Sequence, residues 1–163
     1  MNMEPVDALM DILLLNKGSD NACYFMISDD NIKKIMKNSA TMFGSDSIPP
    51  APGTKSHPRN NGTFSRILSH YVRVNKILNL EEAIQKMTGY PATKLGIENK
   101  GYIKLNMDAD LVIFDENVIE DKATFEEPEN MPTGIDYVIV NGELSVKKGK
   151  QTKKRAGRVL RKK

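Results

Sequence analysis

The 163-residue sequence contains one cysteine, two histidines and no apolar run of the length that crosses a bilayer. With Cys23 alone no disulfide can form within the chain, and such usage is typical of a reducing cytoplasm. Its apolar and aromatic neighbours favour a buried, inert thiol over a nucleophile. The longest apolar cluster, residues 12–15, is far shorter than the roughly 20 residues of a membrane span, and acidic rather than basic residues precede it. We therefore expect a cytoplasmic protein without a membrane partner.

Basic residues are concentrated at the C-terminal end. Residues 147–163 contain ten Lys and Arg and no acid, whereas residues 1–146 contain 14 basic and 21 acidic residues. Such a tail is one pattern that binds nucleic acid. It has no interleaved aromatic residues and no docking motif, which favours a solvated segment over a nucleic-acid interface.

The first hundred residues have mainly helical patterns. Apolar residues at helical spacing follow each of several start signals, and glycines mark two ends, Gly18 and Gly96. The first helix presents an apolar face that another surface must cover. The start signals, in chain order, are Pro5, Ser28 as a cap, Thr63 as a cap, the Asn79 and Glu82 capping pair, and Pro91.

Strand patterns dominate after Gly96. They cover residues 102–105, 109–115 and 137–146, and Asn141–Gly142 is a strong signal for a type I′ hairpin turn. Residues 116–136 form a long excursion between strands. One earlier stretch, Ala40 to Phe43, predicts a short buried strand, which needs parallel neighbours that nothing else in the chain supplies.

Three side chains with chemically useful groups lie just before or within the proline-rich loop at residues 47–62. Asp46 precedes it, and His57 and Arg59 lie near its end. Loops of this length are commonly functional or disordered. The pattern fits either chemistry at the end of a strand or a solvated acid followed by a proline-rich turn, and composition alone leaves both open.

A series of motifs in fixed order resembles the C-terminal part of the N-acyl-D-amino-acid deacylases, the D-aminoacylase branch of the metal-dependent amidohydrolases. The resemblance extends from about residue 29 to residue 161. The motifs are GSD at 44–46, HPR at 57–59, GTF-x-R-x-L at 62–68, YVR at 71–73, LEEA-x-x-KMT at 80–88, PA-x-x-LG at 91–96, ADLVIFD at 109–115, ATF at 123–125, GI-x-x-V-x-VNG at 134–142 and GRVLR at 157–161.

The resemblance implies a mixed α+β or α/β fragment in two parts. Residues 1–98 would be the last strand and helices of an amidohydrolase-type (β/α)₈ barrel, with the strand near 40–44 and an active-site loop at 45–62. Residues 99–163 would be the C-terminal strands of a small β-sandwich domain with a basic tail. The isolated strand is then explained, because seven barrel strands are absent.

The resemblance also implies roles for the three side chains. Asp46 matches the aspartate that acts as general base, at the strand end where barrel enzymes place catalytic groups. Arg59 is the expected anchor for the substrate carboxylate, because a guanidinium offers a planar two-pronged donor. His57 is expected to line the pocket or orient the loop. His70 is expected to be an exposed or partly buried helical residue.

Zinc is the cofactor that the resemblance implies for the complete enzyme. The family's histidine and cysteine ligands match no residue here, and Cys23 falls in the wrong place to replace the bridging cysteine. We therefore assign no metal ligand in this chain and expect no fully ligated metal. Ser47 and Ser65 stand where the family commonly has glycine and proline.

The predicted function is that of a piece of a hydrolase that converts N-acyl-D-amino acids to a carboxylate and a D-amino acid, inactive alone for want of metal ligands. It would be a truncated product or one chain of a split enzyme. A non-catalytic module covered by a partner chain or by self-association is the alternative. A third is a nucleic-acid binder acting through residues 147–163. Acyl preference, oligomeric state and origin of the fragment stay open.

Overall fold

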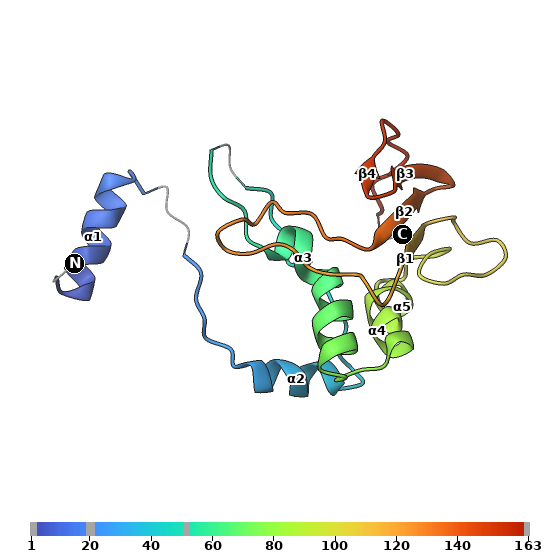
Figure 1. The fold of residues 1–163 in the computed structure, drawn as a ribbon, viewed down its shortest axis with the longest axis horizontal. Helices are drawn as coiled ribbons and strands as arrows, with labels where there is room; N and C mark the ends of the chain where they lie inside the picture. The colour runs from blue at the N-terminus through green and yellow to red at the C-terminus, as the bar shows by residue number, and fades with distance from the viewer. Residues whose placement is uncertain (1–2, 19–21, 51–52, 162–163) are drawn as a thin grey trace. The chain divides into compact units, whose positions relative to one another are not determined.

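The computed structural model describes residues 3–18, 22–50 and 53–161 (Figure 1). The chain forms two compact units, residues 1–32 and 33–163. Within the described ranges no helix is long and apolar enough to span a membrane. The elements are α1 (Pro5–Leu15), α2 (Asp29–Lys37), α3 (Arg59–Arg66), the π-helix η1 (Ile67–Val74), α4 (Leu80–Met87), α5 (Gly89–Leu95), β1 (Leu111–Phe114), β2 (Ile135–Val140), β3 (Glu143–Lys147) and β4 (Lys150–Gln151).

The first unit contains α1, which confirms the helix predicted from Pro5. No residue of α1 is buried, and Leu9 and Met10 are each more than half exposed. The prediction that Cys23 is buried is wrong, since its side chain is exposed. The residues around it, 22–28, form no helix or strand. Apolar neighbours in sequence therefore give the thiol no cover, because burial needs a second packed element.

Caps predicted from sequence form at two helices. The Ser28 hydroxyl accepts a hydrogen bond from the Asn31 amide at 3.3 Å, at the start of α2. Asn79 Oδ1 accepts one from the Glu82 amide at 2.7 Å, at the start of α4. The helix predicted from Pro91 begins earlier, at Gly89, and ends as predicted at Gly96, which has a left-handed φ of 68°.

The predicted helix start at Thr63 is wrong by one turn. Helix α3 begins at Arg59 after the N-cap residue Pro58, and the Thr63 hydroxyl donates back to the Arg59 carbonyl at 2.8 Å. The helix then continues directly into η1, whose wider turns were not anticipated. The start signal was the proline, whose fixed φ suits a helix entrance.

The sheet is antiparallel with strand order β1-β2-β3-β4. Asn141 and Gly142 connect β2 to β3 with φ of 48° and 79°, which confirms the predicted type I′ turn. The short strand β4 lies in the region predicted to be a solvated tail. That region is also tied to the body, since Arg158 pairs with Asp108 at 2.7 Å.

Two predicted strands do not form. Residues 41–50 and 102–105 have no strand structure. The first lacks neighbouring strands among the described residues, and the Phe43 amide donates instead to the Lys86 carbonyl at 3.0 Å. Residues Ile103 and Leu105 are 90% and 93% exposed, so alternation alone did not create a strand without a partner.

Candidate active site

Lys86 fixes the segment that leads to Asp46. Its side chain is 4% exposed, and Nζ donates to the carbonyls of Met36 at 3.0 Å and Asn38 at 2.5 Å. These carbonyls lie at the C-terminal end of α2, where a cation is favoured by the helix dipole. The backbone of Lys86 also accepts from Phe43. One residue of α4 therefore holds both ends of residues 36–43.

Asp46 lies three residues beyond this anchored segment. Its backbone is left-handed, with φ of 50°, a conformation that aspartate tolerates better than most residues. Its side chain is 80% exposed, and its Oδ2 lies 3.0 Å from Nη1 of Arg59, whose side chain is 37% exposed. The structure thus brings together two of the three side chains singled out in the sequence.

Arg59 is the first residue of α3, and its guanidinium is only partly satisfied. Nη1 pairs with Asp46, whereas Nε is buried and has no hydrogen-bond partner within the described ranges. Two nearby buried atoms, Ser56 Oγ and Asn60 Oδ1, are likewise without a partner there. Buried polar atoms are normally hydrogen-bonded, so three unsatisfied atoms close together in sequence distinguish this helix start.

His57 contacts the same helix start. Its Nδ1 accepts a hydrogen bond from the backbone amide of Arg59 at 3.1 Å. Its ring packs edge-to-face on Phe125, with centroids 5.2 Å apart. Partial burial lowers the pKa of His57, the Arg59 guanidinium lowers it further, and the Asp46 carboxylate opposes both effects. Burial and Arg59 therefore favour the neutral form of the imidazole beside the ion pair.

The excursion between β1 and β2 forms a wall of this site. Lys55 Nζ donates to the Glu126 carbonyl at 2.9 Å, and Asn61 Nδ2 donates to the Pro128 carbonyl at 3.4 Å. In Figure 1 the orange trace of the excursion runs beside α3. Asp121 lies so close to Gly62 of α3 that a Cβ at that glycine would overlap its carboxylate. Phe125 is thereby brought to His57 from 68 residues away in the sequence.

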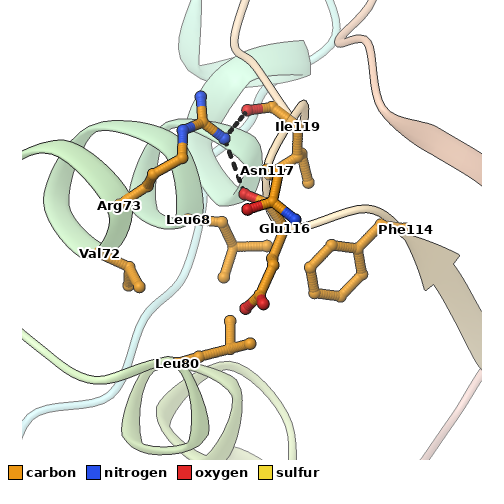
Figure 2. A pocket seen from close by; sticks show the side chains of 8 residues that line it. All are labelled: Leu68, Val72, Arg73, Leu80, Phe114, Glu116, Asn117 and Ile119. Atoms are coloured by element: carbon orange, nitrogen blue, oxygen red, sulfur yellow. Dashed lines mark hydrogen bonds between the residues drawn. The ribbon is translucent and has the colours of Figure 1, made fainter.

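At the start of the same excursion, Arg73 of η1 provides a second attachment. Its Nη1 donates to the carbonyls of Glu116 at 2.9 Å and Ile119 at 2.7 Å, as the dashed lines in Figure 2 show. These residues border a cavity of about 210 Å³ whose other walls are mainly apolar. Neither Asp46, His57 nor Arg59 lines it. Arg73 therefore fastens the excursion rather than serving the site.

His70 is half-buried in η1, with its ring 4.8 Å from that of Tyr71, which confirms the prediction of a partly buried helical histidine. No sequence pattern indicated that Phe125 or Lys86 would contribute to the site. Phe125 belongs to a quoted motif, ATF, but only the fold reveals its contact. Nothing in the local sequence of Lys86 indicates burial.

The part of the chain that the structure describes contains no group of three or more His, Cys, Asp or Glu side chains placed to hold a metal ion. Asp46 contributes a single carboxylate. Zinc sites in proteins need three or four converging ligands. The described residues therefore do not fit a zinc site on their own.

Residues 5–146 match the model of the amidohydrolase family. The chain is 40% identical to a D-aminoacylase of Alcaligenes xylosoxydans xylosoxydans over 139 residues, which are 85% of this chain and 28% of that enzyme. A crystal structure of D-aminoacylase, described as defining a novel subset of amidohydrolases, superimposes with a TM-score of 0.80 at 41% identity, covering 84% of this chain and 28% of that one.

A second solved relative is N-acyl-D-glutamate deacylase from Bordetella bronchiseptica, complexed with zinc and a phosphonate that mimics the tetrahedral intermediate. It superimposes with a TM-score of 0.71 at 37% identity, covering 74% of this chain and 25% of that one. The chain thus spans about a quarter of the length of the enzymes that it matches.

Proposed function

This chain belongs to the amidohydrolase family, and we propose that it forms the part of an N-acyl-D-amino-acid deacylase that carries the catalytic general base and the anchor for the substrate carboxylate. The reaction of the complete enzyme is hydrolysis of the amide bond of an N-acyl-D-amino acid to a carboxylate and a D-amino acid. The observation that carries this proposal is the pairing of Asp46 with Arg59 at 3.0 Å in a chain so similar to D-aminoacylase.

Arg59 is the proposed anchor for the substrate carboxylate. A guanidinium binds a carboxylate through two parallel hydrogen bonds, and such charge-assisted pairs are among the strong ones. The Arg59 side chain is 37% exposed, so an incoming carboxylate would reach its terminal nitrogens. It would compete with Asp46 for these nitrogens. Substrate binding would therefore free the Asp46 carboxylate.

Asp46 is the proposed general base. Freed from Arg59, its carboxylate takes a proton from the attacking water and delivers it to the leaving amide nitrogen. The side chain is 80% exposed, so a substrate bound at Arg59 can reach it. Positioned acid–base groups contribute about 10² to 10⁴ in rate, which is the loss expected when this carboxylate is removed.

Zinc is the proposed metal of the complete enzyme, because a structural relative is complexed with it. Its function there would be to activate water. The described residues supply too few ligands, so the ligands would come from the parts of the deacylase fold that this chain does not span. We expect the chain alone to be inactive.

A chimaera tests this proposal. The 139-residue segment of the Alcaligenes D-aminoacylase that aligns with this chain would be replaced by the residues of this chain. The zinc-loaded chimaera should hydrolyse an N-acetyl-D-amino acid, and the isolated chain with zinc should not exceed its metal-free control. A folded chimaera without activity, or zinc-dependent turnover by the isolated chain, would refute the proposal.

An interaction module is the second candidate, and one surface favours it. A largely apolar cavity of about 840 Å³ lies between α4, α5, residues 97–103 and β1. Strand β1 is at the edge of the sheet, and apolar side chains near it are exposed, including Val112 and Ile113. A stable, metal-free homo-oligomer in analytical ultracentrifugation would support this candidate. Association with the remaining part of a deacylase would support the enzyme.

A further inference from the structure

The first two amides of α3 have their acceptors on a single residue, whereas the Asn61 and Gly62 amides donate to the Pro58 carbonyl. The first amides of a helix have no partner within it, and the N-cap residue Pro58 contributes no side-chain hydrogen bond. His57 supplies two acceptors instead. Its carbonyl accepts from the Asn60 amide at 2.9 Å, and its imidazole Nδ1 accepts from the Arg59 amide at 3.1 Å.

We propose that His57 is a positioning residue, whose neutral imidazole caps α3 through Nδ1 and thereby fixes the direction in which Arg59 extends toward Asp46. A nitrogen that accepts cannot carry a hydrogen, so the neutral ring must carry its proton on Nε2. The geometry is that of an Asx-turn, in which a side chain accepts from the amide two residues later. His57 therefore acts on substrate through Arg59 rather than by touching it.

The excursion fixes the other side of the imidazole. Phe125 meets the ring at an interplanar angle of 78°, in an edge-to-face arrangement that aromatic rings favour. The hydrogen bond from Lys55 to the Glu126 carbonyl holds the neighbouring backbone. The ring orientation is thus set by two segments that are distant in sequence, as a positioning role requires.

Electrostatics favours the same protonation state. A proton on Nδ1 would face the Arg59 amide hydrogen and the positive end of the helix dipole. The Arg59 guanidinium adds a second positive charge nearby, and Asp46 supplies the opposing negative charge. The acceptor form is therefore the one compatible with the helix start.

The capping role holds for this chain by itself. Only the effect of the cap on substrate binding by Arg59 rests on the proposed function. The NMR and hydrogen-exchange experiments that test the cap do not use catalytic activity. Their failure would leave the deacylase proposal intact, and a dead chimaera would leave the capping role intact.

The tautomer can be measured on the unmodified full chain by NMR of ¹⁵N-labelled histidine. The sequence has only His57 and His70, so the variant His70→Asn assigns both signals. At pH 8 His57 should show a protonated Nε2 and an unprotonated Nδ1. A proton on Nδ1 would overturn the proposal.

A matched pair of substitutions tests the cap. His57→Asn places an amide oxygen where Nδ1 lies, whereas His57→Gln places its amide near Nε2. Hydrogen exchange of the Arg59 amide should change less than about twofold in His57→Asn and accelerate about fivefold in His57→Gln, the effect of losing one N-cap bond. Equal exchange in both variants would overturn the proposal. If His57→Gln does not fold, the tautomer measured by NMR and the Arg59 amide exchange in His57→Asn still test the proposal.

Discussion

Nη1 of Arg59 lies 3.0 Å from Oδ2 of Asp46, so in the free chain the proposed substrate anchor is occupied by the proposed general base. Under the proposed function, a substrate carboxylate would displace Asp46 from the guanidinium. Binding of an anionic substrate and release of the Asp46 carboxylate would then be coupled. This coupling would make the site selective for substrates that carry a carboxylate.

Replacing Arg59 tests that selectivity. In the chimaera, Arg59→Met should raise the KM for an N-acetyl-D-amino acid by about 10- to 100-fold, because a hydrogen bond between charged groups contributes about 1.5–3 kcal/mol. Steady-state kinetics measures the change. The corresponding N-acetyl-D-amino acid amide lacks the carboxylate and is the control substrate. Equal increases in KM for both substrates would contradict the anchor role.

Substituting Gly62 tests how closely the excursion, residues 116–136, packs against α3. Alanine normally favours a helix over glycine, but Gly62→Ala would force its Cβ into Asp121. We expect the free energy of unfolding to fall by about 1–3 kcal/mol, the usual effect of overpacking. Urea denaturation measures it.

The control for Gly62 is Gly157→Ala, at a position where a Cβ would meet nothing within 4 Å. That change should stay within about 0.5 kcal/mol. The double variant Gly62→Ala with Asp121→Ala should recover much of the loss, because the clash is removed. Additive losses would show that Asp121 is not the obstacle.

Substituting Lys86 tests how strongly it holds residues 36–43, the segment before Asp46. Lys86→Met removes the donor to the buried Met36 carbonyl and to the partly buried Asn38 carbonyl. The free energy of unfolding should fall by about 1.5–3 kcal/mol. Lys94→Met, on an exposed position of α5, is the matched control and should be nearly neutral. Similar effects of the two substitutions would show that the Lys86 contacts contribute little.

Local signals in the sequence predicted much of the helical part and the hairpin. The caps at Ser28 and Asn79 and the turn at Asn141–Gly142 each rely on side chains or φ preferences within four residues. The predicted strands at 40–43 and 102–105 failed because a strand is stabilised by partners that the local pattern does not contain. The burial of Cys23 failed for the same reason.

The site was only partly predictable. A loop that begins at Asp46 and ends near Arg59 makes their approach reasonable, and the structure pairs them. The contact of Phe125 with His57 and the burial of Lys86 depend on how distant segments pack. The helix start was misplaced at Thr63, because the helix begins after Pro58 and its first amide donates to the His57 imidazole rather than to a hydroxyl.

The lowered pKa of His57 predicts a pH dependence of stability. The folded ring binds a proton less readily than the unfolded ring, because of burial and Arg59, with Asp46 opposing. The free energy of unfolding should therefore rise with pH between the folded pKa and the usual value of about 6.5, and His57 should contribute no slope below or above that window. Urea midpoints from pH 5 to 8 measure this slope.

The control for the pH experiment is His57→Asn, which keeps an acceptor but cannot titrate. It should show a shallower slope over the same range, while Lys55, Glu126, Arg59 and Asp46 around the ring stay unchanged. Identical slopes in both proteins would show that another group causes the pH dependence.

The most direct test of the central claim is the kcat of the zinc-loaded chimaera with Asp46→Asn. If Asp46 is the general base, kcat for an N-acetyl-D-amino acid should fall by about 10² to 10⁴ while the protein stays folded and keeps its zinc. A kcat within about threefold of the unsubstituted chimaera would contradict the assignment, since a merely structural ion pair at the surface contributes little.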